Sequence, residues 1–306
     1  MEDSIDVTQL AGQLIAIPSF VDTNNDECEL VEFLENFLKR QLPQLSVERQ
    51  QLPTSKRANL IVRGRGKTDV LVVGHIDTVQ PKDGWETDPF AATIRSGSLY
   101  GLGASDMKGS LAAFLAALCD FAKQGDLSRL AILLYVDEEY EFKGMKQFLT
   151  SKTVKAMRPR LILSLDGGPQ PASGCRGLIE LALTVKGKSG HAANPENGVN
   201  AITETIAAVN ETRLSLSKFQ DRYLGATTCN VAYIRGGARR SVDGQIRWQQ
   251  EGNVIADTAE LIFEVRPATT KVTAAKVAKM LEANLNARGL TVEQATTKHD
   301  LSLIHI

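Results

Sequence analysis

Side chains able to bind a metal or transfer a proton follow three apolar runs in the first half of this 306-residue sequence. The runs and the residues that follow them are 70–73 with His75 and Asp77, 130–136 with the acids 137–139, and 161–165 with Asp166. In open α/β sheets, ligands gather outside the carboxyl ends of the strands. We therefore expect these side chains to share one crevice.

His75 and Asp77 are two residues apart, so in an extended chain both side chains point to the same side. A carboxylate placed there accepts the second N–H of the imidazole and leaves the other nitrogen free for a metal. A strand-capping histidine beside a surface aspartate explains the pair equally well. Asp106, just before a predicted helix at 109–121, is by itself better explained as a helix cap.

Taken together, four of these residues form a ligand set of nitrogen and oxygen atoms without sulfur: His75, Asp106, Glu139 and Asp166. Such a set suits two zinc, cobalt or manganese ions. Two bridged ions lower the pKa of a bound water, and a free glutamate beside them can take and return its proton. Either Glu138 or Glu139 could be that glutamate, and the spacing leaves open which. The pattern favours a two-metal hydrolytic centre.

Hydrophobic periodicity predicts the elements that position these residues. Helical spacing occurs at 5–17, 29–42, 109–121 and 143–150, and short apolar strands occur at 59–62, 70–73, 130–136 and 161–165. This alternation predicts an α/β fold with a mostly parallel sheet, buried strands and helices on both faces. The Gly- and Pro-rich stretch 167–177 is typical of a linker. We place a metal-binding catalytic domain over residues 1–172.

The second half has a different order of elements. Strands are expected at 178–186, 227–235, 259–266 and 289–294, and helices at 199–216 and 271–288. This β-α-β-β-α-β order is typical of a ferredoxin-like domain, which we place over residues 176–298. The polar stretch 236–253 is long for a hairpin connection, so we expect an exposed excursion there.

Composition and short motifs exclude several classes of protein. Lys and Arg number 35 against 36 Asp and Glu, so no overall field attracts nucleic acid. An apolar stretch of membrane-spanning length is missing, and the acidic start MEDSIDVTQL is unlike a secretory signal, so we expect a cytoplasmic protein. The four cysteines form no CxxC pair, which argues against a thiolate zinc site. A GxSxG motif and a complete P-loop are also missing.

Four motifs carry a family resemblance: GHIDTV at 74–79, GLGASDMKGS at 101–110, VDEE at 136–139 and SGHAANPENGVNAI at 189–202. With the opening LIAIPSF, they resemble the co-catalytic zinc hydrolases that include acetylornithine deacetylase, succinyl-diaminopimelate desuccinylase, aminoacylase and glutamate carboxypeptidase. The resemblance implies hydrolysis of the amide bond of an N-acyl amino acid or small peptide. It also implies two divalent ions as cofactors, zinc before cobalt or manganese.

The resemblance assigns a role to each acid of the first half. One ion would be held by His75 and Asp166 and the other by Glu139, with Asp106 shared between them. Glu138 would activate water and then protonate the leaving amine.

Further roles follow from the same resemblance. Asp77 would orient the ligand histidine. The second domain would be the family's lid, through which the protein forms a homodimer, and His191 would stabilise the oxyanion across that dimer. Asn253 and Arg266 would hold a substrate carboxylate. Each of these last three residues could instead be an ordinary turn or strand-end residue.

The sequence also departs from the family pattern. Ala256 replaces a usual proline, and only 40 residues follow Arg266, too few for the return segment that supplies a last metal-binding histidine. The tail 299–306 ends in LSLIHI, which a transposase-adapter sequence would encode. We therefore expect a truncated chain that binds metal weakly and turns over poorly, whereas its full-length parent is active. The alternative is a non-catalytic binding or dimerisation protein that has kept the fold.

Overall fold

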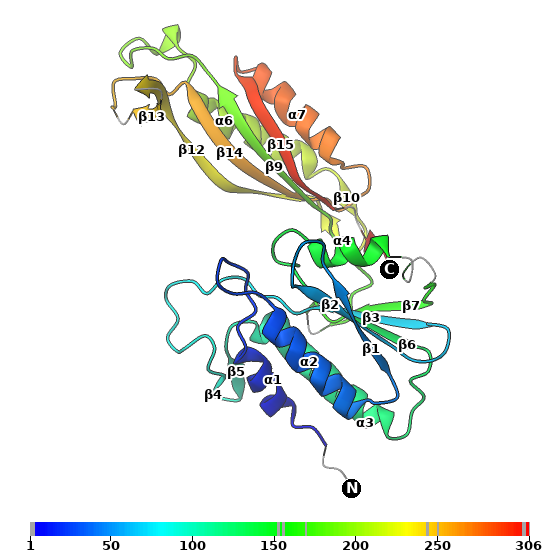
Figure 1. Cartoon of the computed structure of the whole chain (residues 1–306). Helices are drawn as coiled ribbons and strands as arrows, with labels where there is room; N and C mark the ends of the chain where they lie inside the picture. The colour runs from blue at the N-terminus through cyan, green and yellow to red at the C-terminus, as the bar shows by residue number, and fades with distance from the viewer. Residues whose placement is uncertain are drawn as a thin grey trace. The chain divides into compact units, whose positions relative to one another are not determined.

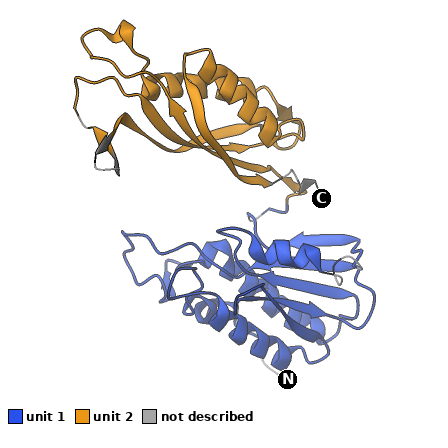
Figure 2. Cartoon of the chain, turned by 45° about the horizontal axis from the view of Figure 1, so that its top comes forward, with its two compact units in different colours: residues 1–171 blue, residues 172–306 orange. Residues whose placement is uncertain are grey.

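The computed structural model describes residues 4–151, 154, 157–168, 170–242, 245–249, 251–301 and 304–305. The chain forms two compact units, residues 1–171 and 172–306 (Figure 2). Each unit combines a five-stranded sheet with helices and has its own hydrophobic core, which confirms the predicted α/β class. Among the described residues, no helix has the length and apolar character needed to cross a membrane.

The first unit is built on a sheet with the strand order β1-β2-β6-β3-β7. Its strands are β1 (Ser46–Gln51), β2 (Ala58–Arg63), β3 (Val70–His75), β6 (Leu130–Tyr135) and β7 (Leu161–Ser164). Its helices are α1 (Val7–Ile15), α2 (Cys28–Gln41), α3 (Gly109–Ala122) and α4 (Lys143–Thr150). A small separate hairpin consists of β4 (Thr93–Arg95) and β5 (Ser98–Tyr100).

Side chains of this sheet alternate between two cores. Leu60 and Val62 of β2 pack with residues of α1, α2 and α3, whereas Ile61 packs on the other side with Phe148 of α4. Figure 1 shows the same division, with α4 on one side of the sheet and the other three helices on the opposite side. Helices therefore cover both faces, as the sequence predicts.

The sheet is mixed, which corrects the prediction of a mostly parallel sheet. β3 pairs in parallel with β6 and β7, but β2 runs antiparallel to both β1 and β6. The prediction missed β1 because its residues, SVERQQ, contain no apolar run. Only residues 52–57 connect β1 to β2, and parallel neighbours need a crossover of about a dozen residues or more. This short connection forces an antiparallel pair.

Strand β7 is exposed, which corrects the prediction of a third buried strand. The side chains of Leu161, Ile162 and Leu163 are 51%, 42% and 46% exposed. The strand stands at the end of the sheet order and pairs with β3. Its apolar run thus marks a strand correctly, but an edge position leaves that run less covered than a central one.

The second unit follows the predicted β-α-β-β-α-β order. Its main elements are β9 (Leu178–Lys186), α6 (Ala201–Leu216), β12 (Thr228–Val242), β14 (Thr258–Arg266), α7 (Ala274–Asn286) and β15 (Thr291–Leu301). Shorter strands are β8 (Gly174–Cys175), β10 (Gln220–Asp221), β11 (Gly225–Ala226), β13 (Gln245–Gln249) and β16 (Ile304–His305). The five-stranded sheet has the order β13-β12-β14-β9-β15, and its pairings are antiparallel.

Two segments of this unit are more regular than the sequence suggests. The expected excursion at 236–253 is mostly a hairpin, in which β12 continues to Val242 and β13 pairs back along it. Trp248 of this hairpin lies between Arg235 and Arg239, whose guanidinium carbons are 5.1 and 5.6 Å from its ring centroid. Likewise, β15 continues to Leu301, past the predicted end at residue 294. Polar cross-strand contacts of this kind leave no hydrophobic signal in the sequence.

Candidate metal centre

His75 is the last residue of β3, and its backbone is held close to the segment that carries Asp106. The backbone N–H of His75 donates to Met107 Sδ at 3.2 Å. A Cβ atom at Gly74 would approach Met107 Cε to 2.7 Å, so the Met107 side chain would have to shift to accommodate one. Asp106 itself lies in the turn Ala104–Lys108 that leads into α3, as predicted.

The imidazole of His75 lies between two acidic residues. Its Nε2 is 2.9 Å from Asp106 Oδ1, and its Nδ1 is 3.1 Å from the backbone oxygen of Asp77 and 3.5 Å from Asp77 Oδ1. His75 and Asp77 are each 1% exposed. The two residues are in contact as predicted, but the closer acceptor for Nδ1 is the backbone oxygen of Asp77 and not its carboxylate, and Nε2 is directed toward Asp106.

Asp166 completes a group of three potential metal ligands. One ligand atom each from His75, Asp106 and Asp166 lie within 4.8 Å of one another. His75 is buried in this group, whereas both aspartates are exposed, so the group opens to solvent. Three of the four predicted ligands thus come together from the ends of β3 and β7 and from the turn before α3.

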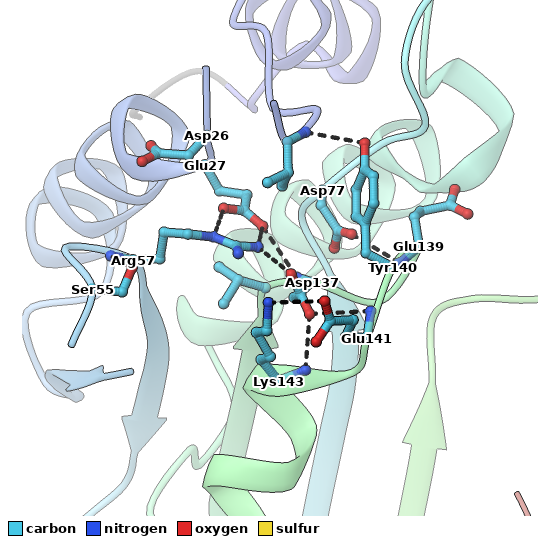
Figure 3. Close-up of polar contacts among 12 residues, drawn as sticks. Asp26, Glu27, Ser55, Arg57, Asp77, Asp137, Glu139, Tyr140, Glu141 and Lys143 are labelled. Atoms are coloured by element: carbon cyan, nitrogen blue, oxygen red, sulfur yellow. Dashed lines mark hydrogen bonds and ion pairs between the residues drawn. The ribbon is translucent and has the colours of Figure 1, made fainter. Parts of the chain in front are cut away.

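The fourth predicted ligand, Glu139, lies in the acidic turn after β6 and is not part of that group of three. Its backbone N–H donates to Asp77 Oδ2 at 2.9 Å, and Figure 3 shows both residues. Burial and the charge of Asp106 raise the pKa of Glu139. The residue is therefore held next to the histidine site by its backbone and lies within electrostatic reach of the ligand group.

Glu138 lies in the same turn and has the more perturbed carboxyl. Burial, together with the charges of Glu139, Asp77 and Asp166, raises the pKa of Glu138 to about 7 against the attraction of His75. A carboxyl that titrates near neutrality can both accept and donate a proton at physiological pH. This distinction between the two glutamates could not be made from their spacing in the sequence.

The donor set fits a divalent cation. Burial disfavours a charged imidazole, but hydrogen bonds to Asp106 and Asp77 outweigh it and raise the pKa of His75 to about 10. Burial and the charge of Asp106 raise the pKa of Asp166. Asp77 Oδ1 is buried and makes no hydrogen bond. The acidic groups at this site outnumber the positive groups that could balance their charge. A bound divalent ion would supply the missing positive charge.

The predicted residues of the second unit fall at two different places. The segments that carry His191 and Asn253 lie side by side, because the backbone N–H of Ala192 donates to the Asn253 oxygen at 2.8 Å. Arg266 is at the opposite end of β14, where its Nε donates to Glu264 Oε1 at 2.9 Å. β14 spans about 25 Å from Thr258 to Arg266 at the usual rise per residue of a strand, and Asn253 precedes its start.

Sequence reasoning missed residues that connect the loops around this centre. Tyr140 is labelled in Figure 3. Its hydroxyl donates to the Thr78 oxygen at 3.1 Å and accepts from the Val21 N–H at 3.0 Å. Nζ of the buried Lys108 donates to the Ile17 oxygen at 2.7 Å. No spacing rule points to these contacts, although Tyr140 directly follows the acidic motif.

Residues 71–304 match the family model described as peptidase family M20/M25/M40. The chain belongs to this family. The match includes the three grouped ligands, the acidic turn and the predicted residues of the second unit. The M20 assignment agrees with the resemblance that the four sequence motifs carry.

Curated relatives of this M20 chain include acetylornithine deacetylases. That of Proteus mirabilis is 33% identical over 271 residues, which are 85% of this chain and 66% of the relative. That of Photorhabdus laumondii is 35% identical over 245 residues, which are 75% of this chain and 62% of the relative. The chain therefore spans about two thirds of the length of these relatives.

Solved structures of M20 proteins share the fold. A metallo-carboxypeptidase from Sulfolobus solfataricus has a TM-score of 0.72 at 18% identity and covers 98% of this chain and 79% of that one. A Staphylococcus aureus tripeptidase has a TM-score of 0.67 at 18% identity, and the match covers 99% of this chain and 78% of the tripeptidase. A Bacillus subtilis protein described as a dinuclear metal binding peptidase from the M20 family has a TM-score of 0.59 at 15% identity, with 98% and 74% covered.

Proposed function

We propose that this protein is a metal-dependent hydrolase that cleaves the amide bond of an N-acyl amino acid or a small peptide. The observation that carries the proposal is the group formed by His75, Asp106 and Asp166, with a glutamate of raised pKa, Glu138, in the adjoining turn. Membership of the M20 family and the acetylornithine deacetylase relatives support the same reaction class.

Two divalent ions would serve as cofactors, zinc first and cobalt or manganese otherwise. His75 and Asp166 would hold one ion, Glu139 would hold the other, and Asp106 would contact both. When bound, such ions supply positive charge that polarises a carbonyl group and lowers the pKa of water. Asp77 would keep the imidazole of His75 in the orientation that presents Nε2.

Glu138 would act as the general acid and base. Its carboxylate would accept a proton from the attacking water and return it to the nitrogen of the leaving amine. A pKa of about 7 suits both steps, because the two protonation states are then close in free energy at neutral pH. The imidazole of His191 would donate to the oxyanion that develops on the substrate carbonyl.

The separation of Asn253 from Arg266 supports a homodimer. Both residues are proposed to hold the substrate carboxylate, yet Asn253 precedes the start of β14 and Arg266 is its last residue. One carboxylate can contact both only if the two residues come from different chains. We therefore propose that the second unit is a ferredoxin-like lid and dimerisation domain, in line with its strand order.

A substrate panel with defined metals tests the function. The purified protein would be stripped of metal, reloaded with Zn²⁺, Co²⁺ or Mn²⁺, and assayed on N-acetylornithine, other N-acetyl and N-succinyl amino acids, and dipeptides. We expect release of the free amine that requires added metal and stops with a chelator. Tight metal binding without hydrolysis in any class would instead support a non-catalytic binding protein.

A further inference from the structure

Three charged side chains outside the metal centre are almost completely buried. Glu27, Arg57 and Asp137 are 0%, 9% and 1% exposed, and they come from three separate parts of the first unit. Glu27 directly precedes α2, Arg57 directly precedes β2, and Asp137 follows β6. Figure 3 shows the Arg57 guanidinium between the two carboxylates. This set is called the Arg57 cluster below.

The Arg57 guanidinium bridges both carboxylates. Its Nε and Nη2 donate to Glu27 at 2.6 and 2.5 Å, and Nη2 also donates to Asp137 Oδ1 at 2.7 Å. Burial opposes the charge on Arg57, but its hydrogen bonds to Glu27 and Asp137 raise the pKa of Arg57, which keeps the guanidinium charged. A planar fork is needed for this geometry, because one ammonium group cannot make the same set of bonds.

Backbone N–H groups of the acidic turn also donate to the two carboxylates of the cluster. Glu27 Oε1 accepts from the Asp137 N–H at 3.1 Å. Asp137 Oδ2 accepts from the Glu141 N–H at 3.2 Å and from the Lys143 N–H at 3.1 Å. Each of the four carboxylate oxygens therefore has a partner, and three of the bonds hold the turn that carries Glu138 and Glu139.

The turn needs this external support because its backbone is unfavourable. Asp137 has φ 69° and Phe142 has φ 57°; this left-handed conformation is tolerated by aspartate but costs a residue such as Phe142 about 1 kcal/mol or more. Asn59 of β2 holds the same segment by accepting from the Val136 N–H at 3.2 Å and donating to the Gly144 oxygen at 2.8 Å. The start of β2 thus holds both ends of the acidic turn.

Stability alone is a weak reason for such an arrangement. A buried ion pair loses hydration of both charges and often stabilises a fold no more than packed apolar side chains do. The Arg57 cluster buries two negative groups against one positive group, which is less favourable than a matched pair. What the cluster achieves is a single conformation for the turn between residues 137 and 143.

We propose that Arg57 is a positioning residue, which acts through Glu27 and Asp137 to fix the backbone of the acidic turn and so aims Glu138 at the His75 site. The effect on Glu138 rests on the function proposed above. The ordering of the turn does not, because it concerns hydrogen bonds within the protein alone.

Hydrogen exchange of the metal-free protein tests the ordering directly. Arg57→Lys keeps the positive charge but loses the fork. We expect peptides covering residues 137–143 to exchange at least about tenfold faster, while peptides from β3 and β6 keep their protection. The matched control is Arg49→Lys, which alters another Arg–Glu pair of the same unit, 2.5 Å to Glu35, away from the turn. It should leave the turn unchanged.

Two outcomes would overturn the proposal. Unchanged exchange at 137–143 would mean that Arg57 does not order the turn, and faster exchange throughout the first unit would mean that it only stabilises the fold. If Arg57→Lys does not fold, the same exchange measurement is made on Glu27→Gln. This variant removes one acceptor for the Arg57 guanidinium and keeps the side-chain shape, so exchange at residues 137–143 should again become faster.

A second measurement separates this proposal from the proposed function. If the wild-type protein hydrolyses a substrate, Arg57→Lys should lower kcat about tenfold or more and leave KM and the Co²⁺ absorption spectrum unchanged. An equal loss of metal and activity would contradict positioning of Glu138. If the wild-type protein hydrolyses no substrate, the proposed function has failed, and the exchange result still decides whether Arg57 orders the turn.

Discussion

Asp77 Oδ2 accepts a hydrogen bond from the backbone N–H of Glu139 at 2.9 Å, which joins two loops that are 62 residues apart in the sequence. The same carboxylate group lies 3.5 Å from Nδ1 of His75. One buried aspartate therefore contacts both the imidazole and the acidic turn. Its charge is also part of what raises the pKa of Glu138 and Glu139.

Replacing this aspartate should weaken metal binding. Asp77→Asn keeps the shape but lowers the basicity of the imidazole, and loss of such a supporting group typically costs about 10- to 100-fold in metal affinity. Competition with a chromophoric chelator measures the affinity for Zn²⁺ or Co²⁺. The control is Asp69→Asn, since Asp69 pairs with Arg129 at 2.6 Å, before the start of β3. Equal affinities for Asp77→Asn and the wild type would contradict the orienting role.

Removing the proton acceptor should separate catalysis from metal binding. Glu138→Gln should reduce kcat by about 10²- to 10⁴-fold, because an amide cannot take a proton from water. Metal content, measured by elemental analysis, should stay at the wild-type level. Glu141→Gln, in the same turn but with an exposed side chain, should keep full activity. Normal turnover by Glu138→Gln would remove Glu138 from the mechanism.

The sequence predicted that His75, Asp106 and Asp166 lie close together because strand order and ligand chemistry both leave local signals. The apolar runs before His75 and Asp166 identify strands whose carboxyl ends meet at one edge of the sheet, and Asp106 directly precedes a strongly helical stretch. Two residues apart in an extended chain, His75 and Asp77 could be placed on one side without knowledge of the fold.

Features that depend on distant contacts left no such signal. β1 is polar, so the antiparallel half of the sheet was not predicted, and the apolar run of β7 does not reveal an edge position. Arg57 looks like an ordinary charged residue in the sequence, although the fold buries it between two carboxylates from other elements. Burial of a charge is decided by the whole unit and not by its neighbours in the chain.

Metal binding should depend steeply on pH. Hydrogen bonds to Asp106 and Asp77 raise the pKa of His75 to about 10 against the effect of burial, so a metal must displace a proton from the imidazole at neutral pH. Affinity should therefore rise by up to about tenfold for each pH unit between pH 6 and 8. Isothermal titration in buffers of different ionisation enthalpy would also detect the released proton. His75→Ala should bind metal more weakly and release fewer protons for each ion bound.

Metal should also stabilise the folded protein. A ligand that binds the folded chain alone adds about 2.7 kcal/mol at a concentration 100 times its Kd. Thermal unfolding with increasing Zn²⁺ or Co²⁺ should show a Tm that rises with concentration and returns to the metal-free value after chelation. Asp166→Asn should reduce the rise. A wild-type Tm that does not change with metal concentration would argue against a metal site formed by His75, Asp106 and Asp166.

Lys108 should make stability depend on pH in its own way. The side chain is 2% exposed, Nζ donates to the Ile17 oxygen, and burial lowers the pKa of Lys108 to about 7. Below pH 7 the amine is charged in both the folded and the unfolded chain, so the folded chain carries the full cost of burying that charge. Between pH 7 and the ordinary lysine pKa of about 10.4, the unfolded chain binds a proton that the folded chain lacks. The Lys108 contribution to the free energy of unfolding should therefore rise with pH in this window.

Lys108→Met isolates that contribution. The free energy of unfolding of the variant minus that of the wild type should fall by about 3 kcal/mol as the pH is raised from 6 to 10. Each unit of pKa shift corresponds to about 1.4 kcal/mol, and structural relaxation around the charged amine reduces the total. Urea unfolding at a series of pH values measures the difference, with Lys123→Met, which removes an exposed lysine at the end of α3, as the control. Loss of the bond to Ile17 shifts the whole curve without changing its slope. A difference that stays constant with pH would mean that Lys108 remains charged in the folded protein.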